Sequence, residues 1–100
     1  LNNKNIILFC AGPYGRAVLK YFIKIGINIK AIVDNNVSFK NKKTENLKIK
    51  QLSYLKQNLK KFSNFHILVC NNYLFEVKKI KSQLVKIGYL ESKITHFNLL

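Results

Sequence analysis

The fold of this chain is decided by the stretch Ile6-Ile7-Leu8-Phe9-Cys10-Ala11-Gly12-Pro13-Tyr14-Gly15-Arg16, which is followed by Asp34 nineteen residues after Gly15. An unbroken apolar run leads into a glycine turn, and uninterrupted apolar strands are typical of parallel sheets buried on both faces. Pro13 suits the first position of a helix, where its missing N–H has no partner to lose. The stretch therefore predicts a buried strand over residues 5–10, a tight turn, and a helix that begins near Pro13.

The same turn has the layout of a phosphate site. Gly12 would let the backbone approach a diphosphate without a Cβ in the way, and Gly15 would let the helix pack closely on the strand. The first helical turn offers N–H groups and a partial positive charge to an anion. The spacing is Cys-x-Gly-x-x-Gly, so Cys10 replaces the first glycine of the dinucleotide-binding fingerprint. The alternative interpretation is a strand-to-helix turn that binds nothing.

Asp34 follows a second predicted strand, residues 28–33. A carboxylate at this position can accept hydrogen bonds from two ribose hydroxyls and would repel a 2′-phosphate, which favours NAD or a nucleotide sugar over NADP. An aspartate before Asn35 and Asn36 can equally initiate a turn. The sequence leaves both roles open.

Further candidates flank the turn or follow a third apolar strand, residues 65–70. Arg16 can clamp a phosphate or lie on the solvent face beside Lys20. Cys70 and Asn71 should border the crevice at the carboxyl ends of the strands, although Asn71 can instead cap the following helix. The predicted cofactor-binding residues are Gly12, Pro13, Tyr14, Gly15, Arg16, Asp34, Asn35, Cys70 and Asn71.

Strands alternate with helices along the whole chain, which predicts the α/β class. We expect one three-layer Rossmann-like domain over residues 1–100, with a parallel sheet of four to five strands in an order near 3-2-1-4-5. The third strand would be at most a stub near Ile49, after a lysine- and asparagine-rich loop that reaches about residue 48. The last strand is expected over residues 93–97.

Three helices are predicted between these strands. The first ends at Gly26, the second covers residues 52–61, and the third runs to residue 87 after Asn71 and Asn72. The side chains expected to face the sheet are Ala17, Val18, Tyr21, Phe22 and Ile25 in the first helix and Leu74, Val77, Ile80, Leu84 and Ile87 in the third.

Composition narrows the function. The net charge is +14, but Arg16 is the one arginine among 18 basic residues. This argues against nucleic-acid binding, because proteins that bind phosphates and bases usually rely on the bidentate hydrogen bonds of arginine. The charge favours anionic ligands or an acidic neighbouring domain. Cys10 and Cys70 form neither a disulfide framework nor a metal site, so we expect a reduced, cytoplasmic protein.

The sequence carries no signature of a membrane-spanning protein or of an enzyme active site. No apolar run is long enough to cross a bilayer, and no catalytic constellation is visible, so any reaction would need residues outside this domain. The chain begins at Leu1 and contains no methionine, which predicts an excerpt of a longer polypeptide.

Residues 7–19 and 26–36 together resemble the Rossmann-like domains of bacterial surface-polysaccharide biosynthesis proteins. Similar domains precede the catalytic part of sugar 4,6-dehydratases, form the N-terminal part of sialic-acid-type sugar O-acyltransferases, and are appended to some sugar methyltransferases. The resemblance implies a nucleotide or nucleotide-sugar ligand held by Gly12, Tyr14, Gly15 and Asp34, next to an adjoining catalytic domain or within a homo-oligomer.

Two departures from that pattern support a different hypothesis. Cys10 stands where these domains usually have glycine, and their common Lys-x-Gly after the second strand is replaced by residues 40–43, Lys-Asn-Lys-Lys. The alternative is a degenerate Rossmann-like module that mediates docking or oligomerisation without a ligand.

Overall fold

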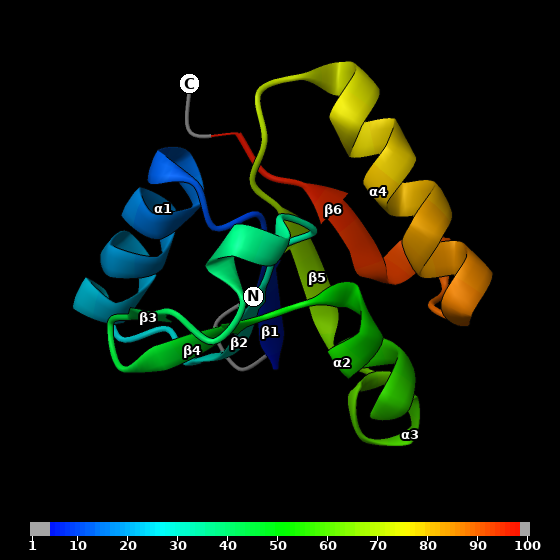
Figure 1. Ribbon diagram of the computed structural model, residues 1–100, viewed down its shortest axis with the longest axis horizontal. Helices are drawn as coiled ribbons and strands as arrows, with labels where there is room; N and C mark the ends of the chain where they lie inside the picture. The colour runs from blue at the N-terminus through cyan, green and yellow to red at the C-terminus, as the bar shows by residue number, and fades with distance from the viewer. Residues whose placement is uncertain (1–4, 99–100) are drawn as a thin grey trace.

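The computed structural model describes residues 5–98, which form a six-stranded sheet covered by helices on both faces (Figure 1). The elements follow one another as β1 (Ile6–Phe9), α1 (Pro13–Lys24), β2 (Ile29–Val33), the 3-10 turn η1 (Val37–Phe39), β3 (Lys43–Thr44), β4 (Leu47–Lys50), α2 (Leu52–Gln57), α3 (Leu59–Phe62), β5 (His66–Val69), α4 (Leu74–Ile87), the 3-10 turn η2 (Glu91–Lys93) and β6 (Ile94–His96). The predicted α/β class and the alternation of strands with helices are confirmed.

The strand order is β3-β4-β2-β1-β5-β6, and every pair except β3–β4 is parallel. The parallel strands follow the expected order, with β4 at the position of the predicted stub near Ile49. The sheet nevertheless has six strands, one more than expected, because β3 adds an antiparallel edge.

The extra strand corrects the prediction of an unstructured loop up to residue 48. Glu45 and Asn46 both have positive φ angles, 48° and 67°, between β3 and β4. Two consecutive residues with positive φ close a two-residue hairpin whose twist matches that of its strands. The usual sequence signal for such a turn contains glycine, which is missing here, so the hairpin was not visible in the sequence.

Alternate residues of the central strand serve two separate cores. Ile6 and Leu8 face α1 and pack with Val18, Leu19 and Phe22, all buried. Ile7 and Phe9 face the opposite side, where α2, α3 and α4 cover the sheet (Figure 1). The packing side chains on this side are Leu55, Phe62, Val77, Ile80 and Leu84. Helices on both faces make the three layers that the sequence predicts.

The helices bury narrower faces than the sequence indicates. In α1, Ala17 and Tyr21 are exposed, as is the C-cap residue Ile25, and Leu19 is buried instead. The helix is fixed at its start by Gly15, which packs directly on the Cys10 carbonyl at the end of β1. In α4, Leu74 is exposed because the contact with the sheet begins one turn later, at Val77.

The helix predicted over residues 52–61 is two short helices. Asn58 lies between them with φ −117° and ψ 27°, outside the helical region. Its side-chain nitrogen donates a hydrogen bond to the Tyr54 carbonyl at 2.8 Å, and its backbone N–H donates to the same carbonyl at 3.1 Å, where α2 ends.

Gly26 ends α1 as predicted. It has φ +84°, its N–H donates to the Ile23 carbonyl, and the N–H of Ile27 donates to the Phe22 carbonyl at 2.8 Å. This is a Schellman termination, in which glycine takes the left-handed position without steric cost. The chain can therefore turn directly into β2.

Candidate functional site

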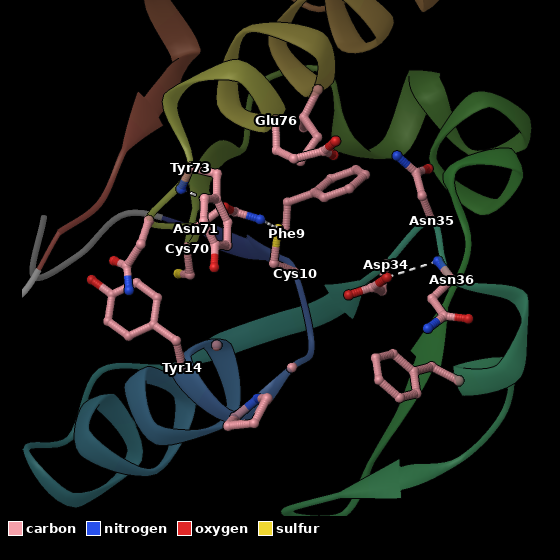
Figure 2. Close-up of a pocket in the computed structure, with 16 residues that line it drawn as sticks. Phe9, Cys10, Tyr14, Asp34, Asn35, Asn36, Cys70, Asn71, Tyr73 and Glu76 are labelled. Carbon is pink, nitrogen blue, oxygen red and sulfur yellow. Dashed lines mark hydrogen bonds between the residues drawn. The ribbon is translucent and has the colours of Figure 1, made fainter.

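A cavity of about 350 Å³ lies where the carboxyl ends of β1, β2 and β5 meet (Figure 2). Open parallel sheets bind ligands at this edge, beside the strand at which the connections change direction. Eight of the nine residues proposed from the sequence line the cavity, namely Gly12, Pro13, Tyr14, Gly15, Asp34, Asn35, Cys70 and Asn71. Arg16 does not; it is exposed and lines a separate hollow with Lys20 and Glu45.

The two glycines of the turn serve different purposes. Gly12 is the N-cap of α1, with ordinary angles of φ −71° and ψ −173°, and a Cβ added there would meet no atom within 4 Å. At Gly15, an added Cβ would overlap the carbonyl oxygen of Cys10. Gly15 is therefore needed for packing, whereas glycine at position 12 leaves free space that the fold itself does not require.

Cys10 occupies the first fingerprint position in a conformation that suits glycine, with φ +89°. This conformation turns the side chain away from the α1 face and toward the α4 face, where its sulfur accepts a hydrogen bond from Asn71 Nδ2 at 3.7 Å. Burial raises the pKa of the thiol to about 11, so it stays neutral at physiological pH. Since a Cβ at Gly12 would still meet open space, the Cys10 side chain leaves that corner of the cavity open.

Asp34 stabilises the neighbouring turns through hydrogen bonds and also lines the cavity. Its Oδ2 accepts a hydrogen bond from the Ala11 N–H, and its Oδ1 accepts one from the Asn36 N–H, each at 2.7 Å. The turn-initiating role that the sequence left open is therefore present. A carboxylate has about four lone-pair sites, so these two bonds leave acceptor capacity toward the cavity.

Asn71 organises the side of the cavity at β5. Its Oδ1 accepts a hydrogen bond from the Tyr73 N–H at 2.7 Å, and its carbonyl lies 2.7 Å from His96 Nε2. The N-cap of α4 is Tyr73, so Asn71 supports the turn before the helix and does not cap it directly. The neighbouring Cys70 is buried in the α1-side core, where burial raises the pKa of its thiol to about 12.

On the β2 side, Asn35 is held in place by α4. Its Nδ2 donates to Gln83 Oε1 at 2.8 Å, a bond between residues far apart in the sequence. Sequence reasoning identified Asn35 but missed Gln83, because no motif connects the middle of α4 to the end of β2.

The charged residues that line the cavity are both acidic: Asp34 and Glu76. They are half of the four acidic residues in a chain of net charge +14. Glu76 was not identified from the sequence, where a single glutamate in an amphipathic helix gives no signal. Within the part of the chain that the structure describes, no group of three or more metal-ligating side chains gathers.

No helix within residues 5–98 combines the length and the apolar character needed to span a bilayer.

No protein-family model matches the chain, and no curated protein matches it either. Solved structures share its fold. UDP-D-quinovosamine 4-dehydrogenase from Vibrio fischeri superposes with a TM-score of 0.72 at 21% identity, over 96% of this chain and 80% of that one. RSP, a Rex-family repressor, gives 0.69 at 19% identity, over 96% of this chain and 53% of that one. Other structures of RSP hold β-NADH, or β-NAD+ with operator DNA.

The chain thus spans about half the length of the repressor that it resembles. At these identities the similarity establishes a Rossmann-like fold and not a shared activity.

Proposed function

We propose that the domain binds a nucleotide, either NAD or a nucleotide sugar, in the cavity at the ends of β1, β2 and β5. In this proposal the diphosphate lies at the N-terminus of α1 over Gly12, and Asp34 accepts hydrogen bonds from the ribose hydroxyls. The observation that carries the proposal is the open space at Gly12 beside a carboxylate that lines the same cavity. The fold it shares with a repressor bound to β-NADH supports it.

The chemistry of the cavity fits such a ligand. A volume of about 350 Å³ lies within the usual range of small-molecule sites. No lysine or arginine lines the cavity in the described part of the chain, so the phosphates would be held by N–H groups at the start of α1. The net charge of +14 adds a long-range attraction for anions. Asp34 would disfavour the 2′-phosphate of NADP.

We further propose that the domain belongs to a bacterial, cytoplasmic enzyme of surface-polysaccharide or sugar modification, with the reaction supplied by an adjoining catalytic domain or a second subunit. The sequence resemblance described above supports this. The structural similarity to a UDP-sugar dehydrogenase over 96% of the chain agrees with it at the level of the fold.

Calorimetry with NAD, NADP, UDP-glucose and CDP tests the binding proposal. We expect affinity in the millimolar range or tighter for at least one of them, and weaker binding of NADP than of NAD. Gly12→Val should abolish the binding because its side chain would fill the open corner, and the φ angle at Gly12 tolerates it. Ala17→Val, on the exposed side of α1, is the matched control and should bind normally.

Two results would refute the proposal. One is the absence of heat with every ligand at millimolar concentration. The other is unchanged binding in Gly12→Val.

A docking role is the second candidate, and one surface favours it. Tyr73, Leu74 and Phe75 are consecutive and are 74%, 60% and 77% exposed at the start of α4. Adjacent exposed apolar residues are typical of protein interfaces. In this alternative the surface contacts a second copy of the chain.

Analytical ultracentrifugation distinguishes this alternative. A docking role predicts association that increases with concentration and disappears in Leu74→Ser/Phe75→Ser, while nucleotide binding stays absent. A monomer at all concentrations argues against self-association through this surface.

A further inference from the structure

Glu76 is a carboxylate of the cavity that the proposed ligand position leaves unused. It lies in the first turn of α4, is half-buried and lines the cavity. Within residues 5–98, no hydrogen bond or ion pair engages its side chain. Figure 2 shows it directed from α4 toward Asn35 and the end of β2. Its charge and that of Asp34 both add to the effect of burial in raising the pKa of the Cys10 thiol, so both border the same space.

The position of a bound base follows from the proposed function, on which this inference rests. With the phosphates at Gly12 and the ribose at Asp34, the base extends away from Gly12, because the base is attached at C1′ and the 5′-phosphate arm at C4′, on either side of the ring oxygen. Phe39, Ile80 and Glu76 are also among the residues that line the cavity, with Phe39 on the α1 side of the sheet and Ile80 on the α4 side. Phe39 and Ile80 offer apolar contacts to the base, and Glu76 offers a hydrogen-bond acceptor to its edge.

We propose that Glu76 accepts a hydrogen bond from the exocyclic amino group of the base, so that the cavity selects adenine or cytosine nucleotides over uracil nucleotides. An ionised carboxylate is an acceptor only. Adenine N6 and cytosine N4 are donors, whereas uracil presents the O4 acceptor at the corresponding position. Two acceptors that face each other in a partly buried site both lose hydrogen bonds to water without replacement.

The surrounding amides do not offset this preference. Asn35 and Asn36 are both exposed, so a hydrogen bond from either amide to a base replaces one to water and contributes little. Asn35 also uses one of its two N–H groups on Gln83. The half-buried Glu76 therefore decides between bases, which favours NAD or a cytidine nucleotide over a UDP-sugar.

Paired nucleotides that differ in the amino group test the inference on the whole chain. AMP is compared with purine riboside 5′-monophosphate, which lacks the 6-amino group, and CMP is compared with UMP, each by calorimetry. We expect the amino-bearing member of each pair to bind about tenfold more tightly, as for a hydrogen bond to a charged group.

Two variants assign the preference to this side chain. In Glu76→Gln the amide can rotate to donate or accept, so the affinity ratio within each pair should fall to about one. Glu91→Gln makes the same change on an exposed residue of η2 and should keep the wild-type ratio. Because no bond engages Glu76, its substitution leaves the fold intact, which circular dichroism checks.

The outcomes separate this inference from the proposed function. Equal affinities within both pairs in the wild type, or a preference that persists in Glu76→Gln, overturn the role of Glu76 and leave nucleotide binding standing. Failure of all four nucleotides and of NAD to bind overturns nucleotide binding itself, and the base preference with it.

Discussion

Cys10 is the residue at which sequence and backbone disagree most. Its φ angle of +89° is one that side chains with a Cβ rarely adopt, and glycine adopts it freely. The sequence showed that a fingerprint glycine was replaced, but only the structure shows that the backbone kept the glycine conformation. The thiol is accommodated by turning toward Asn71, and Gly12 remains open.

This conformation predicts that, at position 10, the glycine variant is more stable than the alanine variant, the reverse of the usual order. Both Cys10→Gly and Cys10→Ala remove the thiol, but alanine keeps the strained backbone. We expect Cys10→Gly to have the higher free energy of unfolding by about 1 kcal/mol, the cost of a Cβ in the left-handed region. Urea denaturation measures both. At a position with ordinary angles alanine would be the more stable, so that order would show that Cys10 is not strained.

Tyr89 carries a buried hydroxyl without a hydrogen-bond partner in the described structure, and the residue is 2% exposed. An unsatisfied buried polar group costs about 1–3 kcal/mol. We therefore expect Tyr89→Phe to raise the free energy of unfolding by about 1 kcal/mol at neutral pH, allowing for the small void left by the oxygen. A decrease would indicate that the hydroxyl has a partner, such as an ordered water.

The same variant has a pH signature. Burial raises the pKa of Tyr89 from 10.0 to about 12, so the unfolded chain loses this proton at lower pH than the folded one. The stability that comes from keeping the Tyr89 hydroxyl protonated is complete below pH 10 and is lost as the pH rises toward 12. The advantage of Tyr89→Phe over the wild type should therefore widen above pH 10, as followed by thermal melts.

At the scale of elements, the contact between α1 and β1 depends on Gly15. An alanine within the first turn of a helix normally stabilises it relative to glycine. Here the added Cβ would overlap the Cys10 carbonyl oxygen, so Gly15→Ala should lower the free energy of unfolding by about 2 kcal/mol, as in overpacked sites. Gly12→Ala, with open space around the added Cβ, is the control and should change stability by less than about 1 kcal/mol.

The elements also show what the sequence could predict and what it could not. The buried strands were predictable because β1 and residues 67–69 of β5 are uninterrupted apolar runs, and the end of α1 was predictable because Gly26 is a glycine. The β3–β4 hairpin was missed because Glu45 is an unusual residue for a positive φ angle and the turn contains no glycine. The division between α2 and α3 lies at Asn58, where the backbone leaves the helical region, and such a change at a single residue has no periodic signature.

The candidate site likewise contains residues that the sequence could predict and residues that it could not. Gly12 and Asp34 were predictable because a motif fixes their spacing along the chain. Glu76 and Gln83 were not, because α4 reaches the cavity only through the tertiary fold. A local pattern can place the residues proposed to contact the phosphates and the ribose, but Glu76, proposed to contact the base, lies in a helix more than forty positions after Asp34.

For the whole molecule, the dominant feature is the charge of +14 on 100 residues. Within residues 5–98 a single ion pair is formed, between Lys20 Nζ and Glu45 Oε1 at 3.8 Å, and its lysine side chain is 69% exposed. Exposed pairs of this kind contribute little. The lysines therefore mainly repel one another in the compact state, and this repulsion is relieved on unfolding.

Salt should consequently stabilise the fold. Raising NaCl from 0.01 to 0.2 M shortens the screening length from about 30 Å to under 10 Å. A relief of about 1 kcal/mol would raise the melting temperature by about 4–8 °C in a domain of this size. KCl and NaCl should act equally, because screening depends on ionic strength. Scanning calorimetry without added nucleotide measures the effect, and a melting temperature that stays constant or falls over this range would show that lysine repulsion does not limit stability.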